Sequence, residues 1–188
     1  MIVTAYKLDY RRPEIASAIS NQQHMHKLLC NAFGKSRQDA GLLYRIDESS
    51  MILFLKSNEI PPVIKGFEEI AQRKITLDEI GLDNFRFSIV CSPNYKWDKK
   101  RCYIRDERLR KEWLYKKLHG CSIEKLSESQ VKRNVFISHS DNKGKDATII
   151  LRQYDGVLKI TDPKMFYDTM NKGVGPHLAY GAGLLMLM

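Results

Sequence analysis

Residues 21–34 read NQQHMHKLLCNAFG, and in this stretch the chain changes from the period of a strand to that of a helix. The residues before it, 2–8, alternate well enough to form a strand. Within it, apolar side chains recur at i, i+3, i+4, i+7 and i+8, which is one face of an amphipathic helix. These side chains are Met25, Leu28, Leu29, Ala32 and Phe33. Ser20 or Asn21 can cap the start of the helix, and Gly34 stands where a glycine commonly ends one.

The elements expected after this helix complete a known order. Two apolar runs at 42–46 and 51–56 flank a short polar stretch, which predicts a β-hairpin. We then expect a short helix at 67–72 and a strand at 85–90. The resulting order, β-α-β-β-α-β, is that of the ferredoxin-like unit.

The C-terminal half shows a similar order in a weaker pattern. We expect a helix that is capped by Asp106 and ended by Gly120. The other expected elements are strands at 135–138, 147–152 and 157–160, a tight turn at 154–156, a short helix at 163–171 and a last strand at 184–187. A boundary near Ser92-Pro93-Asn94 gives two domains, 1–92 and 93–188. The predicted fold class is α+β, with two tandem ferredoxin-like (RRM-like) βαββαβ domains and a C-terminal glycine-rich loop.

The charge balance indicates an anionic partner. Thirty-one Lys and Arg face 22 Asp and Glu, which leaves a net charge of +9. Such an excess attracts polyanions, so nucleic acid or an anionic membrane is a natural partner; the alternative is a solvated basic surface with no partner. The apolar runs at the start and the end are too short for a signal peptide or a membrane span. The four cysteines lack the spacing of a zinc site, and unpaired thiols fit a reducing cytoplasm.

The tail carries a glycine motif. Residues 173–185 read GVGPHLAYGAGLL, with four glycines in eleven residues. Glycines permit positive φ and leave backbone N–H groups open to a phosphate, although a turn before an edge strand would look the same. The motif is not a P-loop, because no Gly-Lys-Ser/Thr follows, and it is not a dinucleotide fingerprint, because no βαβ unit begins there.

Taken whole, this motif resembles the signature of CRISPR repeat-RNA endonucleases, and of the CasE family in particular. Other stretches are similar to that family in the same order along the chain. They are the opening strand followed by Met25-His26, Phe85-Arg86-Phe87 followed by Ser92-Pro93-Asn94, the helix at 113–118, and Tyr154-Asp155-Gly156-Val157-Leu158. The chain departs from the family at Gln23, where a Tyr is usual, and at Leu178, where a Lys is usual.

The resemblance implies an endoribonuclease that cleaves CRISPR repeat stem-loops in precursor RNA, in the cytoplasm that the thiols already indicate. It implies attack by the 2′-hydroxyl without a metal or another cofactor, and retention of the product as a subunit of the type I-E Cascade complex. The alternatives are a non-catalytic RNA-binding subunit of the same fold and a basic scaffold that only bridges proteins.

Cutting RNA in this way needs a base, an acid and a cation near the phosphate. Histidine can exchange protons at neutral pH. The helical phase puts His26 at the edge of the buried face beside Gln23, with His24 on the opposite, solvated flank. From periodicity alone His26 is a boundary histidine, whereas the resemblance assigns it the catalytic role. Gln23 is its expected helper, as a hydrogen-bond donor to phosphate, and His24 is a second titrating group if the helix begins differently.

The predicted RNA contacts combine cations with the glycine motif. Phosphate contacts supply affinity, and an A-form stem is recognised mainly by its shape and backbone. The resemblance places two lysines at the tip of a hairpin that enters the groove of the stem-loop. The predicted RNA-binding residues are Arg105, Arg108, Lys111, Lys132, Arg133, Lys143, Lys145, Gly173, Gly175, His177, Gly181 and Gly183.

Overall fold

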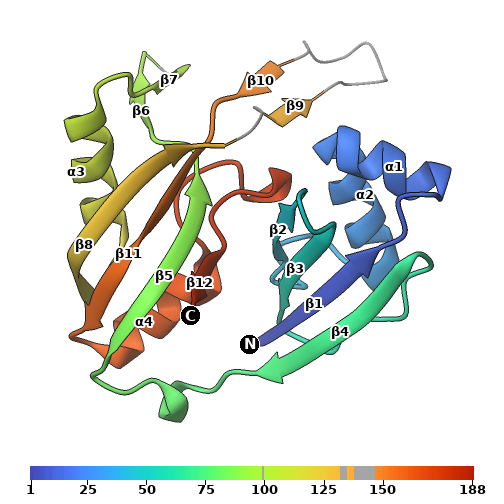
Figure 1. Cartoon of the computed structure of the whole chain (residues 1–188), viewed down its shortest axis with the longest axis horizontal. Coiled ribbons are helices and arrows are strands. Elements are labelled where there is room, and N and C mark those ends of the chain that lie inside the picture. Colours follow the sequence, from blue (N-terminus) through green and yellow to red (C-terminus); the bar gives the residue numbers. More distant parts are fainter. Residues whose placement is uncertain (99, 132–134, 138–146) are drawn as a thin grey trace. The chain divides into compact units, whose positions relative to one another are not determined.

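The computed structural model describes residues 1–98, 100–131, 135–137 and 147–188 (Figure 1). The chain forms two compact units. The first comprises Met1–Ile75, Asn134–Ile149 and Ala179–Gly181, and the second comprises Thr76–Arg133, Ile150–Leu178 and Ala182–Met188. Three residues of the glycine motif therefore belong to the first unit.

The first unit is built on a four-stranded antiparallel sheet. Its strands are β1 (Ile2–Leu8), β2 (Leu43–Asp47), β3 (Ile52–Ser57) and β4 (Phe67–Lys74). They lie in the order β2-β3-β1-β4, the strand order of a ferredoxin-like domain. Two helices, α1 (Pro13–Ser20) and α2 (Gln22–Phe33), connect β1 to β2 (Figure 1). Residues 58–66, all of them described, connect β3 to β4 without a helix.

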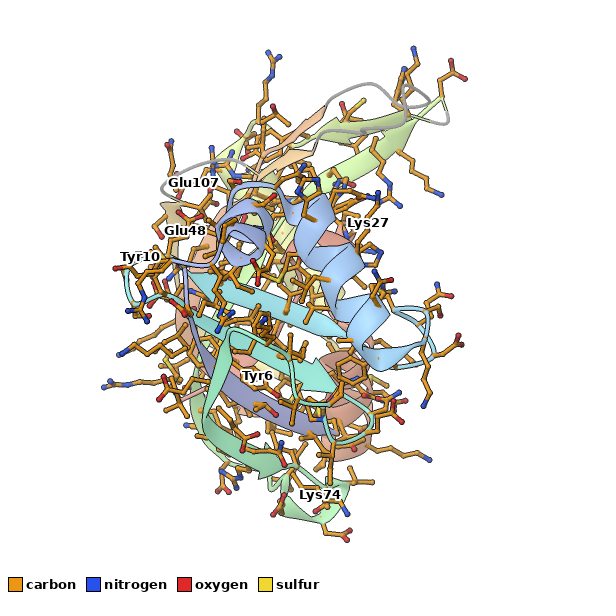
Figure 2. All side chains as sticks on the ribbon, turned by 90° about the vertical axis from the view of Figure 1, so that its right-hand side faces the viewer. Tyr6, Tyr10, Lys27, Glu48, Lys74 and Glu107 are labelled. Carbon is orange, nitrogen blue, oxygen red and sulfur yellow. The ribbon has the colours of Figure 1, made fainter. Side chains whose placement is uncertain are left out.

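Helix α2 confirms the prediction made from its period. Met25, Leu29 and Phe33 are buried in a core shared with the sheet and α1, whereas Lys27 lies on the exposed side of the helix (Figure 2). Burial of such side chains contributes about 1.5–3 kcal/mol each. The Asn21 side chain accepts a hydrogen bond from the Gln23 backbone N–H at 3.0 Å, and Gly34 ends the helix in the left-handed conformation. Both ends therefore follow from local sequence.

Two expectations for this unit were wrong or incomplete. The helix expected at 67–72 is strand β4, which pairs with β1 along its whole length. Its Glu, Ala and Gln residues favour a helix weakly, and pairing with a free sheet edge overrides that preference. Helix α1 was not expected, although Pro13 at its first turn and the buried Ile15, Ala18 and Ile19 are a helix signal.

The sheet of the second unit repeats the strand order of the first. It contains β5 (Asn84–Cys91), β8 (Cys121–Gln130), β11 (Arg152–Ile160) and β12 (Leu185–Leu187), in the order β12-β5-β11-β8. In Figure 1, helix α4 (Pro163–Lys172) lies behind these strands, and helix α3 (Glu107–Lys117) lies at their left-hand edge beside β8. The chain order β5-α3-β8-β11-α4-β12 is again ferredoxin-like. The predicted fold class, two tandem ferredoxin-like domains, is confirmed.

Short elements complete the structure. Two are two-stranded hairpins, β6 (Asn94–Trp97) with β7 (Lys100–Tyr103), and β9 (Val135–Ile137) with β10 (Ala147–Ile149). Two are single 3₁₀ turns, η1 (Leu77–Glu79) and η2 (Leu178–Tyr180).

Three differences from the expected order concern the second sheet. Strand β5, expected as the last strand of the first domain, pairs with β11 and β12. The compact units change at residue 76, whereas the division into domains 1–92 and 93–188 stays a prediction. Strand β8 was not expected, since its mostly exposed, polar residues give little periodic signal.

The tight turn expected at 154–156 is wrong, because β11 runs straight through it. A side chain at Gly156 would collide with the carbonyl oxygen of Lys125 on β8. The glycine therefore serves the close approach of two strands, next to a register shift at Val157/Leu158.

A buried ionic cluster joins α3 to this sheet. Arg110 donates to Glu128 Oε1 from Nε at 2.7 Å, and the Arg152 Nε lies 3.2 Å from the same oxygen. The side chains of Arg110 and Glu128 are only 8% and 5% exposed. Both guanidinium groups also lie over the Tyr103 ring, at 6.0 and 5.5 Å. Arg110 further donates to the carbonyl of Ile104 at 3.4 Å, so the cluster fixes the chain where the β6–β7 hairpin ends.

Candidate active site

Helix α2 places His26 beside the glycine motif. The half-buried imidazole has its Nδ1 3.6 Å from the Sγ of Cys30, one helical turn later. Its ring meets the Tyr180 ring in an edge-on contact, with centroids 6.2 Å apart and planes at 73°. Tyr180 lies in the part of the motif that belongs to the first unit. The predicted catalytic histidine and the tail motif are thus in contact within one unit.

A buried tyrosine holds the tail segment against α2. The Tyr44 hydroxyl lies 3.1 Å from the Ala179 carbonyl oxygen, 2.9 Å from Gln22 Oε1 and 3.3 Å from the Gln22 carbonyl oxygen. It has one proton and donates to one of these acceptors at a time. Burial raises the pKa of Tyr44 well above its usual value, so it remains a neutral donor. Gly181 has φ of +78°, and a Cβ there would lie 3.3 Å from the Tyr44 ring.

The electrostatics around His26 favour a neutral imidazole. Burial, and secondarily the positive charge of Arg37, lower the pKa of His26 below its usual value. The Arg37 guanidinium is held by the Leu42 carbonyl oxygen, to which its Nη1 donates at 3.2 Å. Burial raises the pKa of the Cys30 thiol, so that group stays protonated near neutral pH. The site therefore combines a neutral base with a nearby fixed cation.

Arg37 and Tyr180 are candidate site residues that the sequence analysis missed. Arg37 stands in a polar loop after the helix, with no motif around it, and only the chain reversal at Gly34 brings its charge near His26. Tyr180 lies inside the glycine motif, where its aromatic ring was a signal that glycine-based reasoning did not use.

Of the two residues considered beside His26, His24 differs from expectation, and the role of Gln23 stays a prediction. Gln23 is half-buried, and its Oε1 is buried without a hydrogen-bond partner among the described residues. His24 was expected to be solvated on the opposite flank. Instead its Nδ1 lies 2.7 Å from the Ser17 Oγ of α1, so this ring joins the two helices. The additional helix α1 explains the difference.

The remaining part of the motif is explained by packing in the second unit. Gly175 and Gly183 both have positive φ. A Cβ at Gly175 would lie 2.7 Å from the Trp113 ring, and one at Gly183 would collide with Leu178. His177 also adopts positive φ (+64°), which is uncommon outside glycine. Burial, and then the charge of Arg101, lower the pKa of His177.

The predicted RNA-binding cations differ in their surroundings. Arg105 is exposed. Arg108 lies 3.7 Å from Glu112, and Lys111 lies 2.7 Å from Glu107, so an acidic neighbour partly neutralises each charge. Lys132, Arg133, Lys143 and Lys145 lie outside the described residues. The role in RNA binding of all these cations, and of the glycines, stays a prediction.

Within the described residues, no three His, Cys, Asp or Glu side chains gather as a metal-binding group. In the same part of the chain, none of the helices has the length and apolar character needed to cross a membrane.

Solved structures share this fold. The chain is similar to CRISPR endoribonuclease Cse3 bound to a 19-nucleotide RNA, with a TM-score of 0.87 and 19% identity over 100% of both chains. It is similar to Cas6e from Escherichia coli str. K-12, with a TM-score of 0.76 and 20% identity over 100% of this chain and 98% of that one. A chain of a CRISPR RNA-guided surveillance complex, pre-nicking, has a TM-score of 0.77 and 21% identity over 100% and 99%.

No curated protein matches the chain at a significant level. The sequence model of a family described as CRISPR associated protein matches residues 1–188, the whole chain. The chain therefore belongs to this family of CRISPR-associated proteins.

Proposed function

We propose that this chain is a CasE-type endoribonuclease that cleaves the repeat stem-loop of precursor CRISPR RNA. The observation that carries the proposal is the contact between His26 on α2 and Tyr180 of the glycine motif. A histidine with a lowered pKa, beside a tail segment in which Gly181 has positive φ, is suited to moving a proton next to a phosphate. The names of the similar structures, a CRISPR endoribonuclease and Cas6e, support the same substrate class.

The chemistry follows from the groups present. Neutral His26 accepts the proton of the 2′-hydroxyl, whose oxygen forms a bond to the adjacent phosphorus. The bond from phosphorus to the 5′-oxygen breaks, and the proton taken up by the imidazole is available to that leaving oxygen. Arg37 supplies positive charge for the phosphorane. The products are a 2′,3′-cyclic phosphate and a 5′-hydroxyl, and no step in this route uses a metal ion.

Labelled repeat RNA incubated with the protein in EDTA tests the proposal. We expect one cut at the 3′ foot of the stem, with a cyclic phosphate or 3′-phosphate upstream and a 5′-hydroxyl downstream. A 2′-deoxy substitution at the cut should abolish cleavage and leave binding intact. A 5′-phosphate product, or a requirement for Mg²⁺, would refute the mechanism. Tight binding without any cut would instead favour the non-catalytic subunit.

We further propose that the protein stays with its product as a Cascade subunit. The similar chain in a surveillance complex supports this assignment. After cleavage, the upstream product carrying the stem-loop should co-elute with the protein in size-exclusion chromatography. Release of that product would argue against a lasting subunit role.

A further inference from the structure

A basic groove opens in the second unit, on residues that the proposed cleavage does not use. Its volume is about 930 Å³, and it is lined by the β6–β7 hairpin, the C-terminal part of α3, α4 and the start of the glycine motif. Five cations line it, and the only acid in its lining is Asp168. These cations are Lys96, Arg101, Lys116, Lys117 and Lys172.

Most of the charges in this groove form no ion pair with the residues that the structure describes. Lys172 lies 3.7 Å from Asp168, an exposed pair of the kind worth about 0–1 kcal/mol. Across the described part of the chain, none of the other four cations forms an ion pair with a carboxylate. Lys116 and Lys117 have a structural reason to be cationic, because they end α3 and complement its dipole.

Lys96 and Arg101 have no such reason. They stand directly opposite each other in the antiparallel pair β6–β7. Like charges in that position destabilise a sheet, and an isolated two-stranded hairpin is only marginally stable. A phosphate bound between the two side chains would turn this repulsion into attraction. The charge of Arg101 also contributes to the lowered pKa of His177, so Arg101 lies near the glycine motif.

The same hairpin offers flat aromatic surfaces. Tyr95 lines the groove and is half exposed, and Trp97, two residues further along the strand, is 71% exposed. Bases stack on such rings when their faces are free, which is the case in a single strand and not inside a duplex. Proteins that bind single strands combine a positively charged groove, which follows the phosphate backbone, with exposed aromatic rings on which bases stack. This groove has both features.

We propose that this groove binds a single-stranded RNA segment that adjoins the repeat stem-loop. The proposal rests on the proposed function for the identity of the RNA, and it adds a subsite for the flank. The phosphates lie along Lys96, Arg101, Lys116 and Lys117, and a base stacks on Tyr95. The paired cations Arg108 and Lys111, earlier on α3, take no part in it.

Binding of two RNAs by catalytically blocked protein tests this subsite. One RNA is the repeat stem-loop alone, and the other carries an eight-nucleotide single-stranded flank on one side or the other. All variants carry His26→Ala, so that cleavage does not interfere. The groove variants are Lys96→Ala/Arg101→Ala and Lys116→Ala/Lys117→Ala. The matched control is Lys125→Ala/Lys159→Ala, which removes two exposed cations of the same unit that do not line the groove.

We expect a flank to tighten binding to the parent protein and each groove variant to remove that gain, by about tenfold or more. The salt slope for the flanked RNA should become shallower by about 1.4, since each single-strand phosphate contributes about 0.7. The control should change affinity less than threefold. Lys96→Ala/Arg101→Ala should leave the melting temperature unchanged or higher, because it relieves a like-charge pair, so a binding loss would not report misfolding.

Groove variants that bind the flanked RNA as the parent does would overturn the proposal. An equal loss with and without the flank would also overturn it, because the groove would then belong to the stem site. In each of these cases stem-loop binding by the parent survives, whereas failure of the parent to bind the stem-loop at all would refute the proposed function itself.

Discussion

Two histidines on helix α2, His26 and His24, have different surroundings and therefore different expected roles. His26 is half-buried beside Tyr180 and has no protein partner closer than the Cys30 sulfur at 3.6 Å among the hydrogen bonds of the described residues. His24, two residues earlier, is engaged with Ser17 at 2.7 Å. The His26 ring is therefore free to exchange a proton with a bound ligand, whereas the His24 ring forms a contact within the protein.

His26→Ala should reduce cleavage by at least about 10²-fold, the usual size of a proton-transfer contribution, with stem-loop affinity nearly unchanged. The control, His24→Ala, should cut RNA at the wild-type rate and melt slightly lower, because it loses one hydrogen bond of about 1 kcal/mol. Single-turnover cleavage and thermal melting measure both. An inactive His24→Ala together with an active His26→Ala would transfer the catalytic role to His24.

Tyr180 should act as a positioning residue that keeps His26 desolvated. Tyr180→Ala exposes the imidazole and should move its pKa up toward the usual 6.5. Since the neutral ring is the active form, the acid limb of the kcat/KM profile should shift to higher pH, and activity at pH 6 should fall most. Tyr180→Phe keeps the ring and should leave the limb in place. If Phe instead lowers the rate at every pH, the phenol hydroxyl takes part directly.

At the scale of elements, helix α2, strand β2 and the tail together form the candidate active site. Tyr44, on β2, donates to acceptors on both of the other segments. Gly181 permits this approach because a side chain at its position would press on the Tyr44 ring. The contact between His26 and Tyr180 therefore depends on a hydroxyl that lies outside both motifs.

Tyr44→Phe should lower stability by about 1–3 kcal/mol, because buried acceptors lose their donor. Cleavage should fall together with stability when it is measured well below the melting temperature, since the tail segment holding Tyr180 becomes less ordered. Tyr10→Phe, at an exposed tyrosine, is the control and should change neither quantity. Full activity of a destabilised Tyr44→Phe protein would show that the tail does not need this hydrogen bond.

The buried cluster of Arg110, Glu128 and Arg152 joins helix α3 to the sheet of the second unit. Glu128→Gln leaves two guanidinium groups without their carboxylate and should reduce the free energy of unfolding by about 3–5 kcal/mol. Glu112→Gln, which removes an exposed partner of Arg108, should cost at most about 1 kcal/mol. Denaturant unfolding of both variants decides the matter, and equal effects would mean that the cluster is open to solvent.

For the whole molecule, a net charge of +9 predicts strong salt dependence of RNA binding. The protein should hold a repeat stem-loop far more tightly than an unstructured RNA of equal length. Log affinity should fall linearly with log salt, with a slope of about −0.7 to −0.9 per phosphate neutralised. Filter binding between low and high salt measures the slope. Equal affinity for the two RNAs would leave only a non-specific basic surface.

The amino-acid sequence by itself determined the elements whose signals are local. The apolar face of α2, its Asn21 and Gly34 ends, and the Asp106 cap of α3 depend on neighbours within a few residues, and the structure shows each of them. The glycine motif could likewise be recognised from the sequence, because the glycines that permit positive φ stand at a fixed spacing.

Tertiary structure alone decided which strands belong together. Strand β4 looked like a helix, β8 gave no pattern, and β5 was placed in the wrong sheet, because pairing partners far along the chain select these segments. The site followed the same rule. His26 came from a helix and a resemblance, whereas Arg37, Tyr44 and Tyr180 acquire their roles only where packing brings separate segments together. Proximity of that kind is set by burial and strand pairing over the whole chain, which no local window of sequence contains.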